Sequence, residues 1–207
     1  MRRQKLRGLY VIIDPEVTAG RDELEIAREA MAGGARLIQL RDKRREKGLQ
    51  LPIARGLRAL CREKGALFFV NDHLDLALAA EADGVHLGQK DLPVDVVRRL
   101  APRDMIIGCS TNDAEEARRA EADGADYVSV GRLYATGSKS DTRPATIDTL
   151  RAVKAAVSLP VCAIGGIDAS NIDEVIAAGA DMVAVIAAVV AAPDVRAAAR
   201  RLAERFG

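Results

Sequence analysis

Three polar side chains alternate along one short segment: Gln39, Arg41 and Lys43. Alternate residues of an extended chain share one face, so the segment would present an amide, a guanidinium and an ammonium group together. Arginine binds phosphate oxygens in pairs, and lysine acts as a compact point charge. The spacing therefore favours a polyphosphate site. The charged run over 41–45 is also typical of a solvent-exposed loop, which is the alternative interpretation.

Carboxylates follow two further apolar runs. Asn71-Asp72 comes after one run, and Asp91 comes a few residues after the next. Magnesium is usually held by one or two carboxylates together with substrate phosphates, so these residues predict a Mg²⁺ site beside the cations. The alternative is that each group only caps the helix that follows it. His86, inside a strand-like run, is expected to be a packed and hydrogen-bonded residue. With two histidines and no Cys/His pair at ligand spacing, zinc is not indicated.

A second anion site is indicated later in the chain. The segment Pro160-Val161-Cys162-Ala163-Ile164-Gly165-Gly166 has the pattern of a buried strand that ends in two glycines. Glycine can adopt positive φ and admit a ligand to the backbone, and Asp168 or Ser170 could cap the next helix. Free N–H groups at a helix start favour an anion, so the turn suits a phosphate. A tight turn without a ligand is the alternative.

The loop over 131–144 is long and rich in small polar and charged residues. Thr136, Ser138 and Lys139 surround Gly137 in a pattern that resembles an anion cradle. Long loops in compact domains are often lids or binding loops. A hydrophilic surface loop is the alternative.

The elements that must position these groups alternate regularly. Apolar segments predict strands over 8–13, 36–40, 66–70, 84–87, 105–109, 126–130, 161–164 and 182–186. Helical patterns predict helices over 22–31, 49–64, 74–82, from Pro93, and over 113–122, 146–157, 171–178 and 195–206. Strict alternation implies a parallel sheet, and eight units can close into a single-domain α/β TIM (β/α)₈ barrel over 1–207. An open doubly wound sheet is the alternative, but no G-x-G-x-x-G follows the first strand.

The composition restricts the classes of partner. The chain has 31 basic and 30 acidic residues, a net charge of +1, so neither nucleic acid nor an anionic membrane is indicated. The longest apolar stretch, 182–192, is too short to span a membrane, and no signal-peptide core follows the basic start. The three cysteines are predicted to be buried free thiols. We expect a cytoplasmic protein that acts on small molecules, and a homo-oligomer is compatible with these features.

Together these residues resemble the thiamine-phosphate synthase family, in the family's order and over most of the chain. The matching segments are Gln39-Leu40-Arg41-Asp42-Lys43, Asn71-Asp72, His86-Leu87-Gly88-Gln89-x-Asp91, Gly108-x-Ser110, Thr136-x-Ser138-Lys139 and Ala163-Ile164-Gly165-Gly166-Ile167. The family is a TIM barrel that joins hydroxymethylpyrimidine diphosphate to a thiazole phosphate, usually carboxylated in bacteria. A pyrimidine carbocation is thought to form and to be captured by the thiazole nitrogen.

The resemblance implies a role for each matching residue. The implied pyrimidine diphosphate site comprises Gln39, Leu40, Arg41, Asp42, Lys43, Asn71, Ser110 and Lys139, of which Arg41, Lys43, Ser110 and Lys139 are catalytic. The implied Mg²⁺ ligands are Asp72 and Asp91. The implied thiazole phosphate site comprises Thr136, Gly137, Ser138, Gly166, Ile186 and Ala187. The chain departs from the family at Ala187, usually Ser, and at Arg132 and Ala135, often Pro.

Three rival interpretations remain. The related thiazole tautomerase has His where Arg132 stands and lacks the paired acidic positions. Another phosphate-binding barrel, such as a sugar-phosphate isomerase or aldolase, is the second rival. A Schiff-base aldolase needs a lysine inside the barrel, whereas Lys43 and Lys139 fall at loop ends. A non-catalytic binding protein would be expected to have lost the metal ligands.

Overall fold

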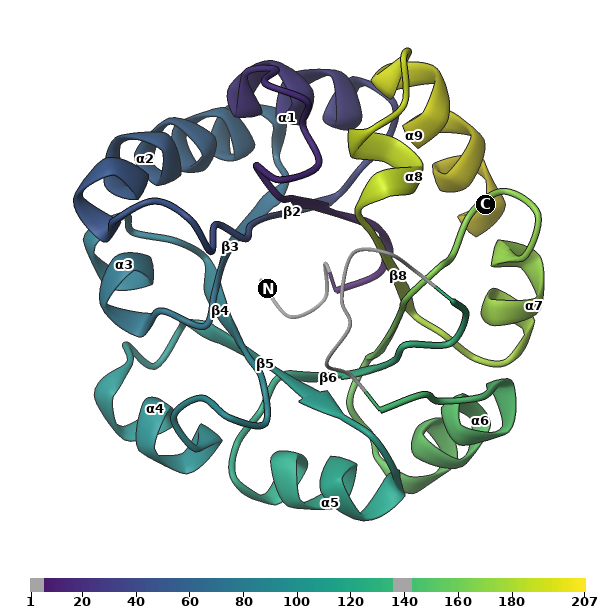
Figure 1. Ribbon diagram of the computed structural model, residues 1–207. Coiled ribbons are helices and arrows are strands. Elements are labelled where there is room, and N and C mark those ends of the chain that lie inside the picture. Colours follow the sequence, from purple (N-terminus) through teal and green to yellow (C-terminus); the bar gives the residue numbers. More distant parts are fainter. Residues whose placement is uncertain (1–5, 136–142) are drawn as a thin grey trace.

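Eight parallel strands close into a barrel in the computed structural model, which describes residues 6–135 and 143–207 (Figure 1). The strands are β1 (Gly8–Ile13), β2 (Leu37–Leu40), β3 (Leu67–Asn71), β4 (Gly84–Leu87), β5 (Ile106–Thr111), β6 (Tyr127–Val130), β7 (Val161–Ile164) and β8 (Met182–Val185). Each strand pairs with the next, and β8 pairs with β1. The predicted (β/α)₈ barrel is confirmed.

Helices form a ring around the barrel (Figure 1). They are α1 (Glu23–Ala32), α2 (Lys47–Lys64), α3 (Leu74–Ala79), α4 (Val94–Leu100), α5 (Ala114–Ala122), α6 (Ile147–Ala156), α7 (Ile172–Ala177), α8 (Ala187–Val190) and α9 (Val195–Ala203), followed by the 3-10 turn η2 (Glu204–Phe206). The single turn α8 was not predicted, because its residues continue the apolar run of β8 and periodicity cannot separate the two.

Side-chain caps set where several helices begin. Asp22, Asp113 and Asp194 each accept a hydrogen bond, of 2.8 to 2.9 Å, from the backbone N–H three residues later. Each bond satisfies a donor that the first helical turn leaves free. At the other end of α2, Gly65 adopts a φ of 71°, the left-handed conformation that commonly ends a helix.

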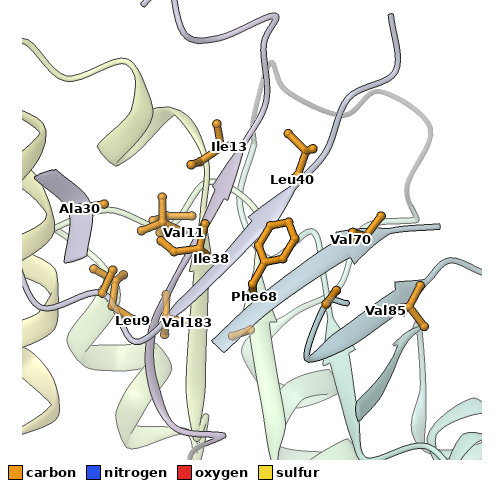
Figure 2. Packing of buried hydrophobic residues seen from close by; sticks show 14 of the residues in the cluster. Leu9, Val11, Ile13, Ala30, Ile38, Leu40, Phe68, Val70, Val85 and Val183 are labelled. Atoms are coloured by element: carbon orange, nitrogen blue, oxygen red, sulfur yellow. The ribbon is translucent and has the colours of Figure 1, made fainter. Parts of the chain in front are cut away.

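The strands carry apolar side chains on both faces. Side chains such as Val11, Ile38 and Phe68 are fully buried in a layer shared with helix residues such as Ala30 (Figure 2). A second cluster, which includes Tyr10, Phe69 and Tyr127, fills the barrel interior. Burial on both faces explains why the strands appear in the sequence as continuous apolar runs.

The three cysteines are free and buried, as predicted. Burial raises the pKa of Cys61 to about 12 and that of Cys109 to about 11. Since the thiolate is the reactive form, these thiols are structural.

Gly108 of β5 makes room for the Tyr127 ring inside the barrel, because a Cβ on Gly108 would lie 2.1 Å from Tyr127 Cζ. Gly108→Ala is expected to lower the free energy of unfolding by about 1–3 kcal/mol, the usual cost of overpacking. Gly48→Ala in α2 is the matched control, since nothing lies within 4 Å of its Cβ. Alanine favours the helix there, so a gain of about 0.5–1 kcal/mol is expected. Urea unfolding measures both variants, and equal stabilities would contradict the packing argument.

Candidate active site

A cavity of about 590 Å³ opens at the carboxyl ends of the strands. The predicted site residues in its wall are Arg41, Lys43, Asn71, Asp72, Asp91, Ser110, Gly166, Ile186 and Ala187. They come from six of the strands or the loops that follow them, so the barrel brings together residues far apart in the sequence. The volume is that of a small-molecule pocket, and this end of a TIM barrel is where active sites are built.

Two cations after β2 lie at the cavity wall, each paired with a carboxylate. Arg41 forms an ion pair with Asp14, which follows β1 and has an almost fully buried side chain. Lys43 forms an ion pair with Asp72 after β3. Because a guanidinium has five N–H donors and an ammonium three, both cations keep donors for substrate oxygens. The pairs therefore fix two cations in positions that suit a polyphosphate.

Asp72 and Asp91 lie within hydrogen-bonding contact of each other. Burial opposes the charge on Asp72, but hydrogen bonds with Lys43 and Asp91 keep its pKa below the ordinary value. Burial and the neighbouring Asp72 raise the pKa of Asp91. The backbone N–H of Gly88 donates to Asp91 Oδ2 at 2.7 Å and orients it. Two carboxylates this close repel each other unless a proton or a cation joins them.

This carboxylate pair fits a magnesium ion. Mg²⁺ is held through one or two carboxylates when substrate phosphates supply further oxygens. Residues 6–135 and 143–207 contain no group of three or more His, Cys, Asp or Glu side chains that could hold a metal ion without oxygens from the substrate. Neither carboxylate caps a helix, since α3 and α4 have His73 and Pro93 at their N-caps without a side-chain cap bond. The capping alternative is therefore wrong for both residues.

Polar side chains continue from the cavity into the barrel. Ser110 lines the cavity, and its Oγ lies 3.0 Å from His86 Nε2. His86 is buried and hydrogen-bonded, as expected from its place in a strand. Gln39 is also buried, and its Nε2 donates to Tyr10 Oη at 2.6 Å. Its side chain lies beneath the cavity and is not part of the wall.

Gly165 and Gly166 form another part of the wall. Both adopt positive φ, 104° and 64°. A Cβ on Gly165 would lie 2.5 Å from Arg132 Cα, and one on Gly166 would lie 2.6 Å from Ala135 O. The turn thus requires glycine for its conformation and for the close approach of the β6 loop.

The predicted cap beside this turn is wrong. The N-cap of α7 is Asn171, without a side-chain cap bond. The Asp168 carboxylate instead accepts from the Ser170 N–H at 2.8 Å. Short local bonds of this kind compete with capping at Asp and Ser positions. The backbone conformation of the two glycines, rather than a capped helix, therefore shapes the turn.

Two predicted residues do not line the cavity. Leu40 packs in the layer between the barrel and the helices. Asp42 is buried and accepts hydrogen bonds from the N–H groups of Arg44 and Arg45, which hold the loop after β2. Any substrate contact by Leu40 or Asp42 would therefore involve backbone atoms. Thr136, Gly137, Ser138 and Lys139 lie outside the described residues.

Several further polar residues lie in the cavity wall. They are Gln89, Lys90, Thr111, Asn112, Ser129, Arg132 and Arg143. In the sequence, their position indicates a place at the site, because most of them lie at or just after the end of a strand. Arg143 donates to Glu116 at 2.6 Å. Lys90 and Arg132 form no ion pair with the described part of the chain.

The fold and cavity define a class of protein, a (β/α)₈ barrel with a small-molecule pocket at the strand ends, where the enzymes of this fold have their active sites. The chain matches the family described as thiamine monophosphate synthase over residues 9–189. Thiamine-phosphate synthases of Methanospirillum hungatei and Moorella thermoacetica are 50% and 52% identical to it, over 95% of this chain and 96% and 94% of the relatives. The chain belongs to the thiamine monophosphate synthase family, which confirms the resemblance.

Solved structures agree with this assignment. A thiamine phosphate pyrophosphorylase from Pyrococcus furiosus is 43% identical with a TM-score of 0.92, and the match covers 100% of this chain and 98% of that one. A 3-hexulose-6-phosphate synthase, at 18% identity and a TM-score of 0.69 over 97% and 100% of the two chains, shares the fold alone. No helix in the described part of the chain is both long and apolar enough to cross a membrane.

Proposed function

We propose that the chain joins hydroxymethylpyrimidine diphosphate to a thiazole phosphate and releases thiamine phosphate and diphosphate. The observation that carries the proposal is a single cavity that combines two cations, a carboxylate pair and a glycine turn. The chain that forms this cavity belongs to the thiamine monophosphate synthase family. Two phosphorylated substrates can each occupy one anion site. Three buried free thiols are consistent with a reducing compartment, and we place the reaction in the cytoplasm.

The reaction exchanges a carbon–oxygen bond for a carbon–nitrogen bond. The bond between the pyrimidine methylene carbon and the diphosphate oxygen breaks, and the electron pair leaves with diphosphate. The thiazole ring nitrogen then donates its lone pair to that carbon. This route needs no protein nucleophile. Arg41 and Lys43, with Lys139 from the loop after β6, would stabilise the negative charge that grows on the leaving group.

Asp72 and Asp91 would hold the Mg²⁺ ion of this site. Bound there, the ion supplies Lewis-acid stabilisation of the diphosphate oxygens. Lys43 would orient Asp72 through their ion pair, so one side chain serves both the metal ligand and the leaving group. At the other site, the backbone of Gly166, Ile186 and Ala187 would bind the thiazole phosphate together with Thr136, Gly137 and Ser138.

Product formation tests this proposal. Purified protein incubated with both substrates and Mg²⁺ is expected to form thiamine phosphate and diphosphate in equal amounts. Mixtures that lack either substrate are the controls. Absence of thiamine phosphate from the complete mixture would contradict the proposed function.

Arg132 distinguishes the synthase from the tautomerase alternative. Arginine stays charged near neutral pH and cannot shuttle a proton as a histidine base does. Arg132→Ala is therefore expected to keep most of the coupling activity. The wild-type protein is expected to show no tautomerase activity in a direct assay. Robust tautomerisation by the wild type, lost in Arg132→Ala, would favour the tautomerase over the synthase.

A further inference from the structure

A chain of hydrogen bonds crosses the barrel beneath the cavity. Gln39 Nε2 lies 2.6 Å from Tyr10 Oη, which lies 3.3 Å from Tyr127 Oη. Tyr127 Oη lies 2.9 Å from His86 Nδ1, and His86 Nε2 lies 3.0 Å from Ser110 Oγ. We call these five residues the interior chain. They come from five different strands, and only Ser110 lines the cavity.

Packing leaves the rings of the interior chain little freedom. Tyr10 and Tyr127 are at most 1% exposed. His86 stacks on Tyr127 with ring centroids 5.5 Å apart, and Phe69 meets Tyr127 edge-on at 5.8 Å. Burial raises the pKa of both phenols well above the ordinary value, so each hydroxyl keeps its proton. The hydrogen bonds therefore have fixed partners.

Gln39 sets the direction in which hydrogen bonds are donated along the interior chain. The Gln39 amide nitrogen can only donate, so Tyr10 Oη is the acceptor in that bond. The single proton of Tyr10 is then available to Tyr127. Tyr127 in turn has one proton, and its remaining partner is His86 Nδ1. His86 Nδ1 is thus an acceptor.

The same logic extends to Ser110. A neutral imidazole carries one proton, so a bare Nδ1 places that proton on Nε2. Nε2 then donates to Ser110 Oγ at 3.0 Å, while Ser129 Oγ lies farther away at 3.5 Å. Once Ser110 Oγ accepts this bond, its own proton is free to point toward the cavity.

We propose that the interior chain fixes His86 in the Nε2–H tautomer and thereby makes the Ser110 hydroxyl a donor to a substrate oxygen in the cavity. His86 and Tyr127 are positioning residues in this account, and Ser110 is the residue that touches the substrate. The effect on turnover rests on the proposed function, whereas the tautomer of His86 does not.

Nitrogen NMR of the ¹⁵N-histidine-labelled full chain tests the tautomer directly. The chain has two histidines, so the spectrum of His73→Gln assigns His86. At about pH 8, the His86 ring is expected to carry its proton on Nε2 and to be bare on Nδ1. A proton on Nδ1 in the wild-type protein would overturn the proposal.

Two matched variants test the direction of hydrogen-bond donation along the interior chain. Tyr127→Phe removes the donor to Nδ1 and is expected to shift His86 toward the Nδ1–H tautomer. Tyr10→Phe removes an equally buried hydroxyl but leaves Tyr127 able to donate to His86, so the Nε2–H tautomer should persist. Equal tautomer populations in the two variants would contradict the order of donors. Circular dichroism checks that both variants fold.

Kinetics test the consequence for Ser110. Tyr127→Phe is expected to lower kcat about tenfold with little change in KM, the scale of one oriented hydrogen bond. In a Ser110→Ala background, the same substitution should have no further effect, because the hydroxyl that it orients is gone. Additive losses would overturn the link between Tyr127 and Ser110. If the wild-type chain forms no thiamine phosphate, the proposed function fails, and the NMR result still decides the tautomer.

Discussion

Removal of divalent metal with EDTA is expected to abolish turnover, and added Mg²⁺ is expected to restore it. Asp72 and Asp91 lie in contact at the cavity wall, and the pKa of Asp91 is raised beside Asp72. The pair is electrostatically incomplete without a proton or a cation between the carboxylates. Because Lewis-acid stabilisation of a leaving group is worth several kcal/mol, the loss should be about 10³-fold or more.

Substitutions separate the metal site from a general salt effect. Asp72→Asn and Asp91→Asn should each weaken Mg²⁺ activation strongly. Asp95→Asn is the control, since Asp95 is an exposed carboxylate on α4 that pairs with Arg99. Undiminished activity in metal-free buffer would contradict the role of the two carboxylates.

Gly166→Val is expected to raise the KM for the thiazole phosphate about 10²-fold, while the affinity for pyrimidine diphosphate stays nearly unchanged. A Cβ at Gly166 would lie 2.6 Å from Ala135 O, and φ there is 64°. A branched side chain must therefore displace the adjacent β6 loop, and misplacement by about 1 Å can cost this much in activity. Steady-state kinetics with each substrate varied in turn measures the change.

Gly65→Val is the matched control for this prediction. Gly65 has a similar φ of 71°, but nothing lies within 4 Å of its Cβ. It should share the backbone strain, which is about 1–2 kcal/mol, and leave both KM values unchanged. Lys139→Ala is the contrasting variant, since a lost charge on the leaving group should lower kcat about 10²-fold. Equal weakening of both substrates by Gly166→Val would show that the two anion sites are misplaced.

The sequence predicted the barrel and the carboxylate pair for the same physical reason. A strand buried on both faces gives a continuous apolar run, and its first polar residue marks the carboxyl end. Asp72 and Asp91 follow β3 and β4, which are neighbours in the sheet, so their proximity was predictable from chain order alone. The glycine turn was predictable because positive φ is rare for other residues.

Other features depend on tertiary contacts that no local pattern encodes. The hydrogen bond between Tyr10 and Tyr127 joins residues 117 positions apart. Asp168 was a plausible cap from its position, but the chain around Ser170 offers it nearer donors. Asp42 stands between two cations in the sequence, yet it turns away from the cavity to hold its own loop.

A crystal structure with Mg²⁺, diphosphate and thiamine phosphate tests the central claim most directly. We expect a metal ion between Asp72 and Asp91, diphosphate oxygens on Arg41 and Lys43, and the thiamine phosphoryl group against the backbone of Gly166. Diphosphate bound instead in the groove beside α2, among Arg55, Arg58 and Arg62, with the strand-end cavity empty, would contradict it.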